Sequence, residues 1–343
     1  VGWAQQARSH DAAVYQFKNE KSKLDIGIAY NQTGASLAGT DYMLTSSYRD
    51  LQYVWFNQKI GDKIQMSLLG MNVGQQVFYT DAWGDDKSAM KYIATFGTHT
   101  KFDFGKFKMN FNGYYQMGSS PTWNNSFIQN YSAYNIGLDA NYKATEKLTA
   151  GLGYEAQSGT TQTDTTSNFG ETSRNFNPFF GTNHKFNGFM DYFYVGSGHG
   201  NVGLQDIYLK LKYKEAKWEL GADVHIFMAG LGVEVYDNVR FTNDLNDAIA
   251  GGDPAVITAV TDDQLNYTLG SMLGTEIDLS FSYKIKKTVT LKAGYSHMLA
   301  SETLASLKGT TYTSGPDAGL GRTDQINNWG YVMIIFKPTF LKQ

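Results

Sequence analysis

Six histidines are the residues of this sequence best suited to acid–base chemistry. Two of them, His10 and His297, directly follow a serine, but neighbouring residues on a strand point to opposite faces, which separates a nucleophile from its base. His99 and His225 stand alone without the spacing of metal ligands, and the chain has no cysteine. The sequence therefore predicts no enzyme, no metal site and no cofactor.

A charged motif, ARSHD (7–11), lies near the start of the chain. If the alternation of the strand that follows extends back through it, Arg8 and His10 share a face with the polar residues of that strand. Arg8 and Asp11 then form part of a charged constriction, or else an exposed ion pair that fixes a loop and contributes at most about 1 kcal/mol. The sequence leaves both interpretations open.

The segment NPFFGTNHKFNGFMDYF (177–193) is too aromatic for an idle solvated loop. Either it folds inward as a constriction or plug, or its phenylalanines only cap a rim. We favour the constriction because long loops are where function concentrates. The residues that would then face a solute are Asn183, His184, Lys185, Asn187 and Asp191.

Aspartates and asparagines between positions 237 and 247 offer the oxygen ligands that calcium prefers. Their spacing does not match an EF-hand loop, so the prediction is a solvated loop. The residues concerned are Asp237, Asn243, Asp244, Asn246 and Asp247.

The elements that must position these side chains are β-strands. In KLTAGLGYEAQ (147–157), Leu152 and Tyr154 share one parity while Glu155 and Gln157 share the other, and a period of two is typical of a strand. The same alternation recurs along the chain and predicts thirteen strands. The clearest examples are 23–30, 107–116, 134–142, 206–213, 218–226 and 276–284.

The connections between these strands alternate between short turns and long polar loops. Tight turns at one end of the strands and long loops at the other are typical of outer-membrane barrels, whereas a soluble sandwich would have long loops at both ends. The predicted long loops cover about 31–50, 74–90, 117–130, 158–202, 227–273 and 298–326.

Composition agrees with an all-β chain, since 36 glycines, 23 tyrosines and 21 phenylalanines accompany only 5 prolines. The net charge of −3 gives no sign of a nucleic-acid partner. The mean hydropathy of −0.37 does not exclude a membrane barrel, in which only every second residue needs to be apolar. We therefore predict a transmembrane antiparallel up-and-down β-barrel, with the apolar parity facing lipid and the polar parity facing water.

Tyr213 and Trp218 near a short turn would belong to an interfacial girdle, although strands are rich in aromatic residues in any case.

The same alternation predicts a lumen in which acidic and basic side chains nearly balance. Lys210 and Lys212 could attract anions there, but the structural expectation is that Asp206, Glu219 and Asp223 on adjacent strands neutralise them through cross-strand ion pairs. The predicted pore-lining residues are Arg8, His10, Asp25, His99, Lys101, Lys108, Asp139, Glu155, Asp206, Lys210, Lys212, Glu219, Asp223, His225, Glu276, Asp278, Lys284 and Lys292.

Bacterial single-chain barrels have an even number of strands, so that both termini lie on the periplasmic side. Thirteen strands would instead place Val1 at the extracellular rim. The expectation is that residues 1–343 form a single outer-membrane barrel domain from which an odd number of N-terminal strands is missing.

Three stretches carry a family resemblance: VGWAQQARSHDAAVYQF at the start, NPFFGTNHKFNGFMDYFYVG (177–196) followed by LQDIYLKLKY, and the closing WGYVMIIFKP. Together they resemble the alginate-export family of outer-membrane β-barrels in its Bacteroidota-type form. The resemblance covers nearly the whole chain and implies an eighteen-stranded monomeric barrel, with about five strands before position 1. A polyuronate conduit would favour arginine in its lumen, and this chain has few arginines.

These observations predict a porin-like channel in the cell outer membrane that passes polar or charged solutes passively, including anionic saccharides. The alternative is a barrel that serves as an anchor, with extracellular loops that bind a partner protein or a glycan. The predicted partners are outer-membrane lipid and a small polar solute or oligosaccharide, and a larger outer-membrane complex is left open.

Overall fold

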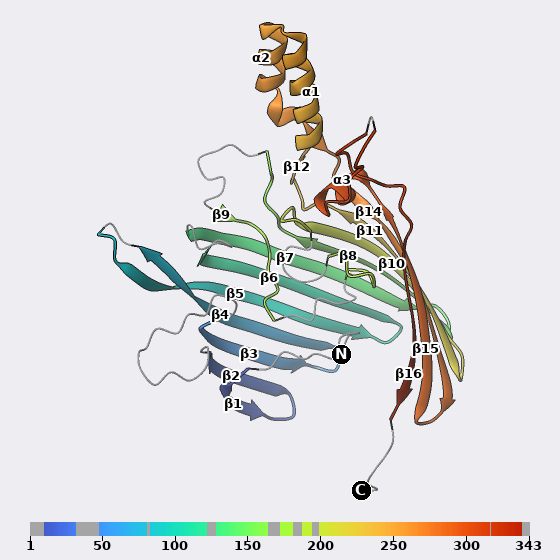
Figure 1. Cartoon of the computed structure of the whole chain (residues 1–343). Helices are drawn as coiled ribbons and strands as arrows, with labels where there is room; N and C mark the ends of the chain where they lie inside the picture. Colours follow the sequence, from blue (N-terminus) through green and yellow to red (C-terminus); the bar gives the residue numbers. More distant parts are fainter. Residues whose placement is uncertain are drawn as a thin grey trace. The chain divides into compact units, whose positions relative to one another are not determined.

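The computed structural model describes residues 10–31, 48–80, 83–121, 128–163, 172–180, 187–193, 199–315 and 317–337 (Figure 1). The chain divides into two compact units. The first contains the residues up to Asp139 together with Thr165–Phe176, and the second contains Ala140–Asp164 and Asn177–Gln343.

The first unit is built from consecutive antiparallel strands, each paired with its neighbour in the chain. A two-residue strand, β9 (Thr172–Ser173), pairs in parallel with β7. The strands in order are β1 (Ala12–Lys18), β2 (Ser22–Tyr30), β3 (Asp50–Ile60), β4 (Ile64–Thr80), β5 (Asp86–Phe104), β6 (Phe107–Pro121) and β7 (Ile128–Lys143), of which β7 runs on into the second unit.

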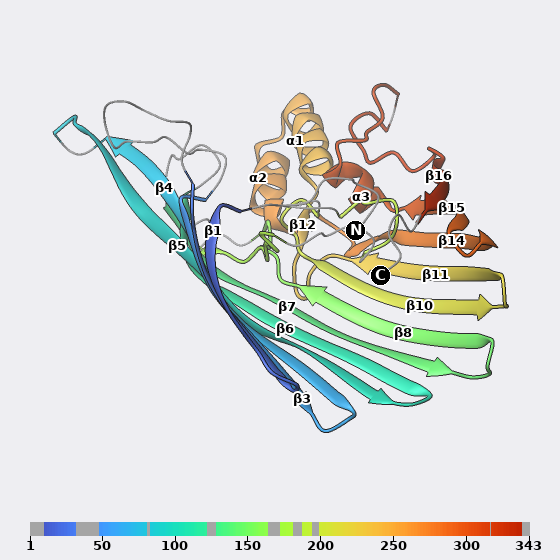
Figure 2. The same cartoon turned by 90° about the horizontal axis from the view of Figure 1, so that it is seen from below.

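The second unit continues the same up-and-down order, and its strands lie side by side in Figure 1. Its main strands are β8 (Leu148–Gln157), β10 (Leu204–Lys214), β11 (Trp218–Met228), β14 (Met272–Lys286), β15 (Val289–Ala300) and β16 (Asn327–Phe336). Between them lie β12 (Val235–Tyr236), α1 (Asn238–Gly251), α2 (Pro254–Asp262), η1 (Gln264–Asn266), β13 (Thr268–Leu269) and α3 (Glu302–Leu307). Helices α1 and α2 lie at the end of the strands opposite the short β10–β11 turn (Figure 2).

The prediction of an all-β antiparallel chain with thirteen main strands is confirmed, because thirteen strands follow one another on the main path of the sheet within the described part of the chain. The apolar parity is outward: Leu152 is 60% exposed and Leu209 is 46% exposed, while Asp278 on the other parity is 1% exposed. A soluble sandwich would bury those leucines between two sheets. The structure therefore excludes a soluble β-sandwich for these strands.

We call the side of the second unit that carries Asp206, His225 and Glu276 the polar face. The side that carries Leu209 and Leu279 is the apolar face. The cross-strand register fixes these sides, because directly paired residues share a side of the sheet.

The prediction of a solvated loop with a conceivable calcium site at 237–247 is wrong, because this stretch forms most of α1. Asp237 caps the helix and accepts a hydrogen bond from the Arg240 N–H at 3.1 Å. Gly252 ends the helix with a left-handed φ of 71°. Asp253 then caps α2, with Pro254 in the first helical turn.

Three of the expected loops are shorter than predicted. Within 117–130, β6 runs to Pro121 and β7 begins at Ile128. Between β4 and β5 the strands extend to Thr80 and from Asp86, so most of 74–90 is strand. Within 298–326, β15 runs to Ala300 and α3 follows it. No helix among the described residues is long and apolar enough to cross a membrane.

Candidate functional site

Acidic side chains gather on the polar face where the strands approach the long connections. Asp278 on β14 lies directly across from Asp223 on β11, and Glu276 lies across from His225. Asp206, Glu276 and Asp278 are at most 1% exposed. Buried carboxylates require hydrogen-bond donors, since an unpaired buried charge is costly.

The donors come from the segment 187–193, which folds onto the polar face. The backbone N–H of Met190 donates to Glu276 Oε1 at 2.8 Å, and that of Phe189 donates to Asp278 Oδ2 at 3.2 Å. Two consecutive amides thus bind two carboxylates on one strand. Ser296 Oγ donates a 2.5 Å hydrogen bond to the other oxygen of Asp278.

Gly188 permits this close approach. Its φ of 79° lies in the left-handed region, and a Cβ built on it would lie 2.5 Å from Glu276 Oε1. Any larger residue would push the segment away from the carboxylate. Glu276 Oε2 is buried and has no hydrogen-bond partner among the described residues.

Asp206 and His225 form a second contact point for the segment. His225 Nδ1 lies 2.9 Å from both carboxylate oxygens of Asp206, and both side chains are almost fully buried. The Asn187 amide Nδ2 donates to Asp206 Oδ2 at 3.3 Å. The imidazole also stacks on Phe227, with ring centroids 5.5 Å apart.

An apolar cluster holds the other end of the segment. Phe193 packs against Phe227 with ring centroids 4.6 Å apart, and α3 covers the cluster from the long connection after β15. Lys308 Nζ donates to the Tyr192 carbonyl at 2.5 Å. Burial, with a smaller contribution from Glu276, raises the pKa of Tyr192. The buried members of the cluster are Phe193, Leu204, Phe227, Leu273, Met298 and Leu304.

Basic residues lie on the same face nearer the short turns. Lys212 forms an ion pair with Glu219 at 2.8 Å, and Lys210 lies opposite Asp223 with its Nζ 4.5 Å from the centre of the Tyr208 ring. From the long connections toward the short turns, the polar face therefore changes from buried acids to more accessible lysines. Asp206, which the sequence paired with these lysines, instead contacts His225 and Asn187.

His199 lies near this cluster, outside the strands. Its Nδ1 accepts a hydrogen bond from the Gly203 N–H at 3.0 Å, which requires that nitrogen to be unprotonated. Burial and, to a lesser degree, Lys308 lower the pKa of His199 to about 4. The imidazole therefore stays neutral at physiological pH in this fold.

The other predicted pore-lining residues of the second unit also lie on the polar face. Glu155 accepts a hydrogen bond from Gln157 Nε2 at 2.9 Å. Lys292 is half-buried opposite Ser282, and Lys284 is exposed next to a short turn.

In the first unit, the predicted residues lie on the side opposite the exposed apolar side chains. Asp139 accepts from Asn110 at 3.0 Å, and Asp25 accepts from Gln16 at 3.2 Å. Lys108 pairs with Asp103 at 2.6 Å. The remaining two, His99 and Lys101, follow the same alternation on β5.

Three predicted loop residues and one predicted pore-lining residue lie outside the described residues: Asn183, His184, Lys185 and Arg8. His10 is exposed and lies 2.7 Å from the Tyr48 hydroxyl, before β1 begins. Asp191 follows the anchored amides with a φ of 58°. No cluster of three or more His, Asp or Glu among the described positions has the arrangement of a metal site.

Sequence reasoning missed the backbone donors of Phe189 and Met190, because an amide has no residue-type signature. It also missed Tyr208, Ser296 and His199 as parts of the site. The NGF tripeptide at 187–189 is the signal that could have indicated a close backbone approach, since glycine marks such positions.

No family model and no curated protein matches this chain. It is similar to the NanC porin, with 8% identity over 84% of this chain and 93% of that one and a TM-score of 0.35. It is also similar to the outer membrane protein OprD from Pseudomonas aeruginosa, with 11% identity over 93% of this chain and 66% of that one and a TM-score of 0.47. OccK11 (OpdR) from the same organism shares 9% identity over 86% of this chain and 68% of that one, with a TM-score of 0.44. Outer-membrane porins are what the chain is similar to, and at these identities and scores no family is assigned to it.

Proposed function

We propose that this chain forms the wall of an outer-membrane β-barrel channel that passes polar or charged solutes passively. The observation that carries the proposal is the division of the strands into two faces. The apolar face exposes large side chains such as Leu209 and Leu279, each close to half exposed. In water this face would be a large aggregation-prone patch, whereas in a bilayer it is solvated by acyl chains.

The segment 187–193 narrows the channel in this proposal. It covers the acids of the polar face, bound by the amides of Phe189 and Met190 at one end and packed through Phe193 at the other. A segment held by both hydrogen bonds and apolar packing is a fixed constriction and not a freely mobile loop. Solutes would then meet Asp191 beside it, but not Asn187 as the sequence predicted, because that side chain is buried against Asp206.

The uncovered part of the polar face sets the preference among solutes. Lys210 and Lys212 lie on the same face as the acidic cluster, where Lys210 is opposite Asp223 and Lys212 pairs with Glu219. Anionic saccharides fit such a wall as weakly held permeants, since conduction requires binding that is weak enough to release. The resemblance to the alginate-export family adds alginate to the solutes worth testing. The scarcity of arginine argues against a conduit dedicated to it.

Single-channel recording in planar bilayers tests the proposal. We expect discrete conductance steps from the purified full chain, and block by short anionic oligosaccharides that relaxes when they are washed out. Alginate oligomers and a neutral maltose series would be compared at equal length. Absence of steps at high protein loading, in bilayers where a known porin inserts, would contradict the channel.

A further inference from the structure

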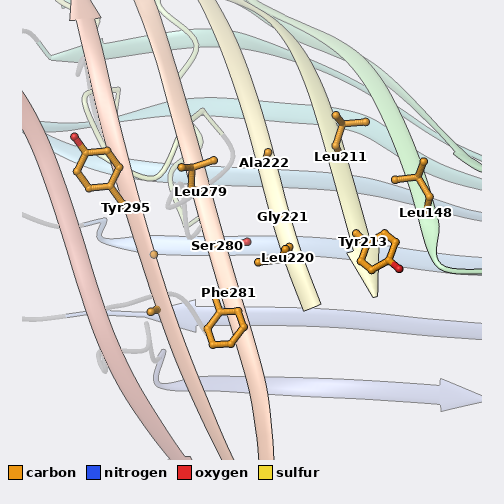
Figure 3. Close-up of a pocket in the computed structure, with 12 residues that line it drawn as sticks. Leu148, Leu211, Tyr213, Leu220, Gly221, Ala222, Leu279, Ser280, Phe281 and Tyr295 are labelled. Carbon is orange, nitrogen blue, oxygen red and sulfur yellow. The ribbon is translucent and has the colours of Figure 1, made fainter. Parts of the chain in front are cut away.

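A groove lies on the apolar face of the second unit, over the strands β8, β10, β11, β14 and β15 (Figure 3). Two small side chains, Ala222 and Ala293, lie within it, and Leu211, Leu279 and Phe281 rise beside them. The register explains the shape: Ala222 is paired with Leu211 and Leu279, and Ala293 is paired with Phe281. Small residues between large neighbours leave an apolar groove on this face.

The groove leads toward three short turns that lie side by side. The Lys214 N–H donates to the Lys147 carbonyl at 2.8 Å, and the Lys284 N–H donates to the Lys217 carbonyl at 2.7 Å. These bonds join the β7–β8, β10–β11 and β14–β15 turns into one rim. Lysines are concentrated there, at positions 143, 147, 214, 217, 284, 286 and 287, against only Glu146 and Glu215.

Several of these lysines are free to bind an anion. Lys147 is bound to Glu215, but Lys217, Lys286 and Lys287 are exposed and form no ion pair among the described residues. Lys286 pairs with Val289 after a register shift, which places it on the apolar face. Long lysine side chains keep their charge at an interface while their stems cover apolar surface.

An aromatic pair lies between the groove and the lysines. The rings of Tyr213 and Trp218 lie with their centroids 5.4 Å apart on the apolar face. Such rings mark the headgroup level of a bilayer. From Ala222 to Lys217 the strand runs about 17 Å at ~3.3 Å per residue, close to one leaflet of a ~30 Å hydrocarbon core.

We propose that this groove and rim bind one anionic glycerophospholipid, with an acyl chain along Ala222 and Ala293 and its phosphate at Lys217, Lys286 and Lys287. The proposal rests on the proposed function only in placing the apolar face in a membrane, and it does not require conduction. Charge complementarity selects the ligand, since a zwitterionic lipid offers the same chain without a net anionic headgroup.

Native mass spectrometry of the purified full chain tests this, with phosphatidylglycerol and phosphatidylcholine of identical chains added to detergent micelles. We expect one phosphatidylglycerol to be retained at an energy that strips phosphatidylcholine. Replacing Lys217, Lys286 and Lys287 by Gln should weaken retention about a hundredfold, since each lysine near an anionic surface contributes about a factor of five. Glycerol phosphate without acyl chains should not compete.

Two further variants separate the groove from the charge. Ala222→Leu with Ala293→Leu fills the groove without changing charge and should abolish selective retention. The control Ala94→Leu lies on β5 of the first unit, on the same parity as the exposed Tyr92 and Phe96 and outside the groove, and should leave retention unchanged. Lys59→Gln with Lys63→Gln removes turn lysines of the first unit and should also have no effect.

Equal retention of both lipids, or unchanged retention in the filled-groove variant, would overturn the lipid site. Conductance steps recorded from the same preparations distinguish a failure of the lipid site from a failure of the proposed channel. A channel that conducts but retains no lipid refutes only the lipid site, and a protein that retains lipid but never conducts refutes only the channel.

Discussion

The backbone N–H of Met190 donates a 2.8 Å hydrogen bond to the carboxylate of Glu276, 86 positions further along the chain. The adjacent amide of Phe189 binds Asp278 in the same way. These two bonds fasten the segment 187–193 to the polar face of β14. The segment's position therefore depends on two acids that are themselves buried beneath it.

Removing one of these acids should loosen the segment. Asp278→Ala takes away the acceptor of the Phe189 amide and of the Ser296 hydroxyl, and hydrogen bonds to a charged group contribute about 1.5–3 kcal/mol each. We expect larger or noisier single-channel steps and faster proteolysis within 177–193. Asp223→Ala is the matched control, since it removes a carboxylate from the adjacent strand and leaves the acceptors of the Phe189 and Met190 amides in place. Equal effects of the two variants would show that charge alone, and not anchoring, governs the steps.

Gly188→Ala should displace the segment by steric means. The added methyl would meet Glu276 at 2.5 Å, and alanine is strained at a φ of 79°. Gly232→Ala carries the same backbone strain at a φ of 69° with no atom within 4 Å, so it isolates the clash. We expect increased conductance and hydrogen exchange at 187–193 for Gly188→Ala only. If both variants behave like the unmodified chain, Gly188 does not control how closely the segment 187–193 approaches Glu276.

The lysines of the polar face should set ion selectivity. Lys210→Glu with Lys212→Glu changes the wall charge by four units and should move the reversal potential in a salt gradient toward cation preference. Lys63→Glu with Lys106→Glu makes the same change in exposed turns of the first unit. We expect a much smaller shift there, because exposed charges are screened within about 10 Å at 0.1 M salt. A shift of equal size in both would place the selectivity filter elsewhere.

Acid should weaken the packing around His199. Its pKa is about 4 in the fold, against 6.5 for a free histidine. As the pH falls, a locally unfolded state that exposes His199 therefore takes up a proton before the folded state does. The folded arrangement, in which neutral His199 is buried and bound to the Gly203 N–H, has its full stability above pH 6.5. Its stability relative to a locally unfolded state falls by roughly 3 kcal/mol by pH 4, at about 1.4 kcal/mol per pH unit. Hydrogen exchange of the Gly203 amide, corrected for intrinsic rates, should rise across this window.

His199→Gln should remove most of that pH dependence. His297→Gln is the control, since His297 contacts Asn328 at 2.5 Å on the apolar side and is not buried. An unchanged profile in His199→Gln would assign the acid response to another group.

The strands could be predicted from the sequence because each residue's environment repeats with period two, as in Leu209 and Lys210. The Met190–Glu276 contact could not be predicted from the sequence, since it joins distant positions through a backbone amide. Helix α1 was missed because Asn243, Asp244 and Asn246 have low helix propensity and lie in a segment that reads as a polar loop. Its cap signals, Asp237 and Gly252, were nevertheless present in the sequence.

Cysteine accessibility tests the central division into two faces most directly, because the chain contains no cysteine of its own. Single variants Leu209→Cys, Lys210→Cys, Leu211→Cys and Lys212→Cys would be treated in intact outer membranes with a charged, membrane-impermeant thiol reagent. We expect rapid labelling at 210 and 212, and labelling at 209 and 211 only after detergent extraction. Rapid labelling at 209 and 211 in the membrane, with protection at 210 and 212, would contradict the division into two faces.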